Sequence, residues 1–181
     1  MKSVLSSLLM AALFIVLTTG FASAQFPVRP TEYNSICEGS SGYVSPPYAY
    51  DDNLSTYSYA NVFQGGKGSV TACEIWEGFP STPGTQMVLN VNSSAEMTST
   101  PGYAGGEAKM LYSLDRGNTW TAFYTLYNRG QIPQQTNSVS LPDNFDLTKI
   151  RVEASCWSSV GYAGYSADCI EQVFEIWVSG S

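Results

Sequence analysis

The alternation of apolar and polar residues predicts strands along most of the chain. Short alternating runs are separated by clusters of Gly, Pro, Asn and Ser, and no long segment after residue 24 has apolar residues at helical spacing. The pattern predicts about seven or eight strands. The clearest runs are residues 68–76, 87–91, 109–114, 119–127, 137–141, 149–157 and 169–178. Because many short strands bounded by turns are typical of two packed sheets, we expect one all-β domain, a single β-sandwich.

Two of the predicted elements are especially regular. Residues 109–114 and 119–127 flank a turn at residues 115–118, and this arrangement predicts a hairpin. In residues 169–178, regular alternation predicts that Val173, Glu175 and Trp177 share one face and that residues 174, 176 and 178 share the other. The four tryptophans all lie inside strand-like runs, so we expect them in the core or on a sheet face.

The start of the chain has the pattern of a targeting segment. Lys2 precedes an apolar run at residues 8–17, and Ala-Ser-Ala at residues 22–24 forms a small-x-small cleavage pattern. A run of this length is too short to span a bilayer, which takes about 20 residues, so no membrane anchor is expected. We therefore expect a secreted protein with a signal peptide at 1–24, an irregular proline-containing lead-in at 25–48 and the sandwich domain at 49–181.

Composition and charge exclude several functional classes. Only 13% of the residues are charged, whereas 44% are hydrophobic and 13% aromatic, which is typical of a folded chain. The sequence has no histidine, so it cannot build a Ser-His-Asp or Cys-His catalytic group or a His-ligated zinc site. A net charge of −7 argues against nucleic acid and against anionic membranes as partners. These features favour a protein that binds its partner over one that transforms it.

The four cysteines predict two disulfides if the protein is secreted. Four cysteines allow three connectivities, and the sequence alone does not choose among them. We favour Cys156–Cys169, because these residues flank one loop between two predicted strands, and this choice leaves Cys37–Cys73. The alternative of a zinc site is disfavoured because no C-x-x-C spacing is present.

Four short motifs occur in order along the chain. The first is the polar turn Ala-Tyr-Asp-Asp-Asn-Leu-Ser-Thr-Tyr at residues 49–57. The others are Tyr-Ser-Leu-Asp-Arg-Gly-Asn-Thr-Trp at 112–120, Leu-Thr-Lys-Ile-Arg-Val at 147–152 and Phe-Glu-Ile-Trp-Val at 174–178. In order and spacing they resemble the motifs of discoidin (coagulation factor 5/8 type C) and related galactose-binding-like domains. The resemblance covers most of the chain after residue 48 and implies that the β-sandwich is a jelly roll.

The polar turn at residues 49–57 is a candidate calcium site. Its closely spaced oxygen-bearing side chains can converge on a hard cation such as Ca²⁺, although a plain Asx-rich turn is the alternative interpretation. The resemblance implies one structural Ca²⁺ near this turn, and the positions that match its ligands are Asp51, Asn53, Thr56 and Glu175. The chain departs from the family at Asp52, where the family usually has glycine.

Loop tyrosines are the candidate ligand-binding residues. Domains like those that the chain resembles bind sugars with aromatic faces and with polar side chains that contact the hydroxyls. The residues expected to contact a ligand are Tyr43, Tyr48, Tyr103, Asn128, Arg129, Tyr162 and Tyr165. The alternative for any one tyrosine is that it packs against the lead-in or covers an end of the sandwich.

The expected function is non-catalytic recognition of an extracellular carbohydrate or cell-surface ligand. The second hypothesis is a structural or assembly subunit of a cell-surface layer or matrix, which would use the sandwich for protein contacts. Catalysis could rest only on carboxylates, such as Glu74 with Glu77 or Asp51 with Asp52 as a glycosidase pair. Such pairs arise by chance in acidic proteins, and a small sandwich rarely forms the deep cleft that glycoside hydrolysis needs, so we do not expect an enzyme.

Overall fold

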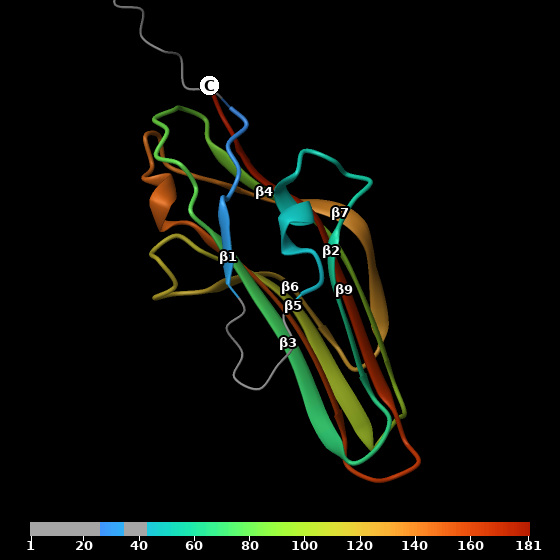
Figure 1. The fold of residues 1–181 in the computed structure, drawn as a ribbon. Helices are drawn as coiled ribbons and strands as arrows, with labels where there is room; N and C mark the ends of the chain where they lie inside the picture. Colours follow the sequence, from blue (N-terminus) through green and yellow to red (C-terminus); the bar gives the residue numbers. More distant parts are fainter. Residues whose placement is uncertain (1–25, 35–42) are drawn as a thin grey trace, which may run out of the picture.

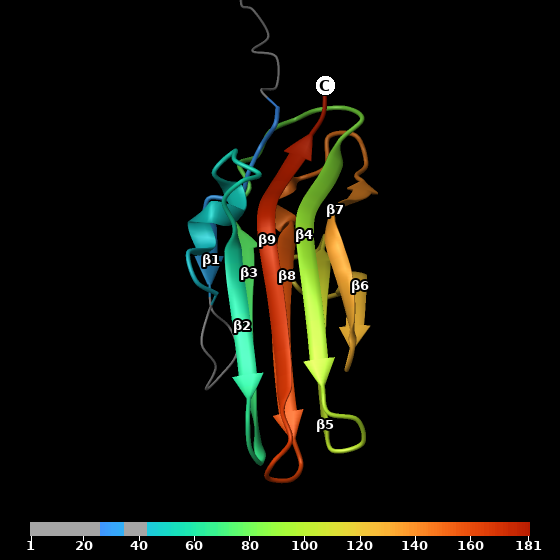
Figure 2. The same ribbon diagram turned by 90° about the vertical axis from the view of Figure 1, so that its right-hand side faces the viewer.

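The structure is a computed structural model that describes residues 26–34 and 43–181. Two antiparallel sheets stack face to face, which confirms the predicted all-β sandwich (Figure 1, Figure 2). Within the described residues the strands are β1 (Glu32–Asn34), β2 (Ser58–Gln64), β3 (Gly68–Glu77), β4 (Val88–Ser99), β5 (Ala104–Ser113), β6 (Thr121–Tyr127), β7 (Gly130–Ser140), β8 (Arg151–Val160) and β9 (Ala167–Ser179). Two short 3₁₀ helices, η2 (Pro46–Tyr50) and η3 (Leu147–Lys149), lie between strands. No helix in this part of the chain is long and apolar enough to cross a membrane.

The strands pair in a nested order. β2 pairs with β9, β3 with β8, β4 with β7 and β5 with β6, as if one long hairpin with the β5–β6 turn at its tip had been rolled up. Rolling brings β9 beside β4 and β8 beside β5, which gives the sheet orders β2-β9-β4-β7 and β1-β3-β8-β5-β6. Apart from the added edge strand β1, these are the two four-stranded sheets of a jelly roll.

β2 and much of β4 and β7 were not expected from the sequence. In β2 the inward positions are Ser58, Ala60 and Val62, whereas Tyr59 and Phe63 face solvent, so large apolar side chains lie on the outer face. Apolar residues therefore lie on both faces of β2, so the strand lacks the usual contrast between an apolar inner and a polar outer face. β7 lies at an edge of its sheet and contains Pro133, a residue that sheets tolerate at edges.

β9 contains a bulge that breaks its predicted alternation. Asn92 of β4 lies opposite Glu175, but the next residue, Ser93, lies opposite Val173, so Phe174 is an extra residue in β9. Val173 and Ile176 are therefore both directed into the core and are both fully buried. The prediction that Val173 shares a face with Glu175 and Trp177 is wrong, because the extra residue reverses the alternation between positions 173 and 175.

Residues from the expected lead-in pair with the sandwich. Val28 exchanges two backbone hydrogen bonds with Val178, at 2.8 Å and 2.7 Å, and β1 pairs with the end of β3. The sandwich thus includes residues that precede the expected domain start at residue 49. The predicted signal peptide lies outside the described residues.

A carboxyl group is buried between the two sheets. Glu171 of β9 is fully buried, and its two carboxyl oxygens accept hydrogen bonds from the hydroxyls of Tyr43, over 2.7 Å, and Tyr124 of β6, over 2.9 Å. Burial raises the pKa of Glu171 to about 8, although the two tyrosine hydrogen bonds partly oppose this shift. The tyrosines, whose own pKa values burial raises, satisfy the carboxyl group without an opposite charge.

This arrangement predicts that stability falls as pH rises from about 4.5 to about 8. Over this window folded Glu171 keeps a proton that the unfolded chain has released, so the unfolding free energy falls by up to about 5 kcal/mol. The chain has no histidine to obscure the effect. Glu171→Gln should flatten the profile in urea unfolding measured across this range, and Glu32→Gln, at an exposed carboxylate on β1, serves as the control. Parallel profiles for wild type and Glu171→Gln would contradict the prediction.

Candidate functional site

The predicted site residues fall at two ends of the sandwich. The turns between β4 and β5 and between β8 and β9 lie at the end away from the C-terminus, whereas the polar turn that follows η2 lies near the C-terminal end (Figure 1, Figure 2). The predicted ligand-binding tyrosines of the first two turns are therefore separated from the predicted metal ligands.

Three of the predicted ligand residues come together at the first end. The Tyr103 ring stacks on Tyr165, with centroids 4.5 Å apart, and meets Tyr162 edge-on at 5.6 Å. The Gly161 N–H donates to the Tyr103 carbonyl oxygen over 2.8 Å, so the β8–β9 turn is tied to the β4–β5 turn. Two turns that are distant in sequence thus form one tyrosine cluster.

A pocket of about 460 Å³ lies beside this cluster. Its lining residues are Gly102, Tyr103, Ala104, Gly105, Asn128, Trp157, Ser159, Gly161 and Tyr162, none of which carries a charge. The aromatic walls are open to solvent: Tyr103 is 49% exposed, Trp157 40% and Tyr162 64%. The pocket therefore offers flat apolar surfaces with a few uncharged hydrogen-bonding groups between them.

Asn128 is held at the edge of the pocket by the backbone of β5. Its backbone has a φ of 57°, in the left-handed region that Asn tolerates better than most residues. Its N–H donates to the Gly106 carbonyl over 2.9 Å, and its side-chain oxygen accepts from the Gly106 N–H over 3.3 Å. A Cβ atom added at Gly105 would lie 2.6 Å from that oxygen, so a larger residue there would displace the Asn128 side chain from its present position.

The other predicted ligand residues lie elsewhere. Arg129 is exposed beside the pocket but does not line it, and its Nε donates to the Ser99 carbonyl over 2.6 Å. Tyr48 lies in η2 and is 47% exposed. Tyr43 is buried against Trp76, and its hydroxyl donates a hydrogen bond to Glu171, so it is a core residue and does not face a ligand.

Trp157 and Tyr127 were not among the predicted ligand residues. Both lie opposite Glu107 of β5, on the two strands that flank it, and Tyr127 is 61% exposed. The two rings thus extend the exposed aromatic surface from the pocket onto the outer face of the five-stranded sheet. The signal was present in the sequence of β8, because Trp157 alternates in phase with the polar residues Arg151, Glu153 and Ser155.

At the opposite end, the 51–57 turn is closed by its own hydrogen bonds. The Asp51 carboxylate accepts from the Asn53 N–H over 3.0 Å and from the Thr56 hydroxyl over 2.7 Å. The Asn53 carbonyl accepts from the Thr56 hydroxyl over 2.9 Å, and the Asn53 side-chain oxygen accepts from the Ser55 N–H over 3.0 Å. These are the bonds of an Asx-rich turn.

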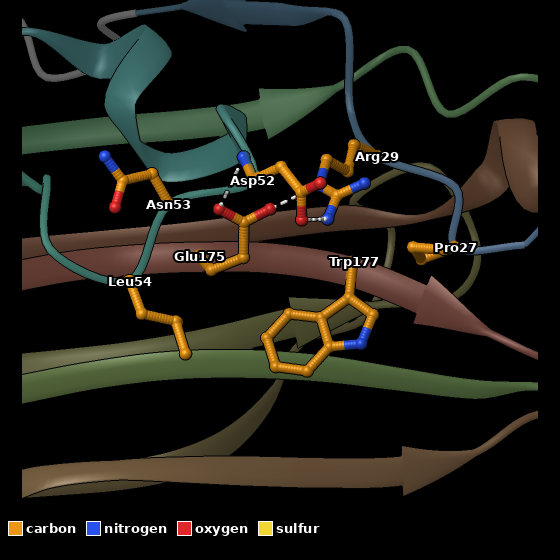
Figure 3. A pocket seen from close by; sticks show the side chains of 7 residues that line it. All are labelled: Pro27, Arg29, Asp52, Asn53, Leu54, Glu175 and Trp177. Carbon is orange, nitrogen blue, oxygen red and sulfur yellow. Dashed lines mark hydrogen bonds and ion pairs between the residues drawn. The ribbon is translucent and has the colours of Figure 1, made fainter.

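Arg29 and Asp52, neither of which is a predicted metal ligand, contact the fourth predicted ligand, Glu175 (Figure 3). The Glu175 carboxylate forms an ion pair with Nε of Arg29 and accepts from the Asp52 N–H over 3.1 Å. The Asp52 carboxylate forms a second ion pair with Nη2 of Arg29. Burial raises the pKa of Glu175, and the Arg29 guanidinium opposes this shift.

These contacts leave the predicted ligands poorly arranged for a metal ion. Asp51, Asn53, Thr56 and Glu175 each use oxygen atoms in hydrogen bonds or ion pairs within the protein, and a guanidinium stands against Glu175. Among residues 26–34 and 43–181, no group of three or more Asp, Glu, His or Cys side chains is placed to hold a metal. In this arrangement the residues do not fit a calcium ion.

The carboxylate pairs considered for catalysis are not paired across a cleft. Glu74 is fully buried, and its carboxylate accepts from the Tyr43 N–H over 3.2 Å, whereas Glu77 forms an ion pair with Arg151 at 2.6 Å. Asp51 and Asp52 both lie on the exposed turn described above. Neither pair has the shared access to a bound substrate that glycoside hydrolysis requires.

Comparison with solved structures finds carbohydrate-binding modules. The family 32 module of AlyQ, solved with 4,5-unsaturated mannuronic acid, is 12% identical over 87% of this chain and 100% of the module, with a TM-score of 0.37. The Family 16 Carbohydrate Binding Module-2 is 14% identical over 76% and 89% of the two chains (TM-score 0.31). TmCBM61, solved with β-1,4-galactotriose, is 10% identical over 83% and 88% (TM-score 0.33). No protein-family model and no curated protein sequence matches the chain. These superpositions are loose, so they place no residue of this chain in a binding site.

A disulfide behind the tyrosine cluster joins the two sheets. Cys156 of β8 and Cys169 of β9 are bonded, with Cα atoms 5.8 Å apart, which confirms the favoured pairing. Both cysteines are fully buried, and the bond closes the loop that contains Tyr162 and Tyr165. Cys37, the expected partner of Cys73, lies outside the described residues.

Removing this disulfide should destabilise the protein and loosen the tyrosine cluster. For a loop of 13 residues, the lost constraint on the unfolded chain corresponds to about 3 kcal/mol of unfolding free energy. The Cys156→Ala/Cys169→Ala variant should show this loss in urea unfolding, together with a weaker near-ultraviolet circular dichroism signal. A loss below about 1 kcal/mol would contradict the expected stabilisation.

Proposed function

We propose that this protein is a secreted, non-catalytic module that binds an extracellular carbohydrate in the pocket bounded by Tyr103, Trp157 and Tyr162. The observation that supports the proposal best is the gathering of these exposed rings, from two turns and one strand, around a single uncharged pocket. Exposed aromatic side chains are common one at a time, but a cluster of them around a concavity is typical of a binding site.

The chemistry of the pocket suits a sugar. The C–H faces of a pyranose ring can pack on the flat faces of Tyr162 and Trp157, while the hydroxyl groups of the sugar need hydrogen-bond partners. The Asn128 amide and the Ser159 hydroxyl line the same pocket. Because Asn128 is fixed to the β5 backbone through its oxygen, its NH₂ group can donate to a ligand at a small cost in side-chain entropy.

The absence of charge in the lining favours a neutral saccharide. A carboxylated or sulfated sugar would lose hydration on entering and would meet no lysine or arginine among the residues that line the pocket. Arg129, which is nearby, is directed to the Ser99 carbonyl and does not line the pocket. We therefore take neutral hexose units, at an end or within a chain, as the ligand class.

Secretion and the lack of catalysis are also part of the proposal. The small-x-small pattern at residues 22–24 and the Cys156–Cys169 disulfide both support export to an oxidising compartment. The pocket contains no carboxylate, hydroxyl–base pair or other acid–base group that could cleave a glycosidic bond. N-terminal sequencing of the exported protein tests the first point, and incubation with polysaccharides tests the second.

Substitution of the pocket aromatics tests the binding site. Tyr162→Ala and Trp157→Ala should each weaken binding to neutral glycans at least about fivefold, because each removes a stacking surface worth about 1 kcal/mol or more. Binding is measured on a glycan array and then by titration with the best ligand. Tyr48→Ala, at an equally exposed tyrosine far from the pocket, is the matched control and should bind like wild type.

Two results would count against the proposal. Unchanged glycan binding in both pocket variants would place the site elsewhere. If wild type retained no neutral glycan and instead self-associated in size-exclusion chromatography, an assembly subunit of a cell-surface layer would be favoured.

A further inference from the structure

Three carboxylates gather at the 51–57 turn around one basic side chain. Asp51 and Asp52 are adjacent on the turn, and the Asp52 N–H donates to the Glu175 carboxylate over 3.1 Å, which brings the three acidic residues into one region. Among the described residues, Arg29 is the one basic side chain that forms ion pairs with members of this group. A turn that concentrates negative charge needs a positive partner, and here the chain itself supplies it.

The backbone fixes where Arg29 points. The hydrogen bonds between Val28 and Val178 place Arg29 opposite Trp177, on the face of β9 that also carries Glu175. Neighbouring N–H groups of the guanidinium fork then contact two carboxylates, Nε with Glu175 and Nη2 with Asp52. A planar fork is suited to this task, because it presents several donors in one fixed arrangement.

Arg29 and Asp52 form a matched pair. Asp52 has a φ of 64°, a left-handed conformation that is easier for glycine, which the resembled family usually has at this position. The aspartate gives Arg29 a second carboxylate, while the Asp52 N–H holds the other oxygen of Glu175. The side chain at this left-handed position is therefore used in the contact that joins the turn to Arg29.

We propose that Arg29 is a built-in cation that takes the place of a calcium ion at the 51–57 turn, so that folding of this protein does not depend on calcium. Glu175 is only 3% exposed, and a carboxylate this buried requires a positive partner if it is to remain charged. The inference does not depend on the proposed carbohydrate binding, because it concerns the opposite end of the sandwich and is tested by metal binding and stability.

Access is not what keeps calcium out. Arg29 lines an open pocket of about 440 Å³ together with Leu54, Asp52, Glu175 and Trp177, so ions in solution can reach the carboxylates (Figure 3). Calcium must instead displace a guanidinium that already contacts Glu175 and Asp52. Removal of the guanidinium should therefore uncover a site for calcium.

The test is the stability and calcium binding of Arg29 variants. Wild type should give no heat on titration with Ca²⁺ and the same Tm in chelator as in Ca²⁺. Arg29→Ala should lower the Tm in chelator by roughly 5–10 °C, because Glu175 is left without its partner. Added Ca²⁺ should restore much of this loss and should give a measurable binding isotherm. Lys67→Ala removes one positive charge from the β2–β3 turn and is the matched control, with no response to Ca²⁺.

Arg29→Lys keeps the test decisive if Arg29→Ala does not fold. Lysine keeps the positive charge but lacks the planar set of donors of a guanidinium. The Tm of Arg29→Lys should therefore lie between those of wild type and Arg29→Ala, with little response to Ca²⁺. Calcium binding by wild type would overturn the proposal, and so would an unchanged Tm in Arg29→Ala. A loss of stability that Ca²⁺ does not restore would also overturn it, because Arg29 would then be an ordinary ion-pair partner.

Discussion

The placement of side chains along β9 is the constraint on which the rest of the structure depends. β9 lies between β2 and β4, and the extra residue Phe174 reverses its alternation part-way along the strand. Glu171 and Glu175 are four residues apart, so a regular strand would put both on the same face. The bulge instead directs Glu171 into the core, to two tyrosine hydroxyls, and Glu175 outward, to Arg29. One inserted residue thus separates a buried carboxyl group from an ion-paired one.

The two ends of the sandwich are stabilised in different ways. At the tyrosine end, the disulfide between β8 and β9 holds the sheets together, so the turn beyond it can expose Tyr162 without support from a core of its own. At the other end, the chain before β1 pairs antiparallel with β9 at Val28 and brings Arg29 to the acidic turn. A covalent link and an ion-pair network therefore add to the apolar packing between the sheets, where side chains such as Trp76, Met110 and Ile176 are fully buried.

Sequence patterns predicted the parts of this structure that depend on residues close together in the sequence. The sandwich, the β5–β6 hairpin and the Cys156–Cys169 pair followed from alternation, turn composition and cysteine spacing. β2 was not predicted from the sequence, because its aromatic residues face outward and its inward residues are small. Tyr103, Tyr162 and Tyr165 were predicted as ligand residues from their glycine-rich loops, but their contacts depend on how the sheets stack. Arg29 could not be assigned, because its partners lie 23 and 146 residues away.

The small number of lysine and arginine residues and the lack of charge in the tyrosine-lined pocket are related. None of the strands β2, β4, β7 and β9 contains a lysine or arginine, and several of the few basic residues are in ion pairs, such as Arg151 with Glu77 and Lys109 with Glu107. Several basic side chains are thus placed where carboxylates need partners, and none lines the pocket between Tyr103, Trp157 and Tyr162. A pocket without ions is less costly to strip of water than a charged one, and its polar groups can satisfy only a few hydroxyls. Selectivity must then come mainly from the shape of the aromatic walls, which favours a sugar whose apolar face is broad and unobstructed.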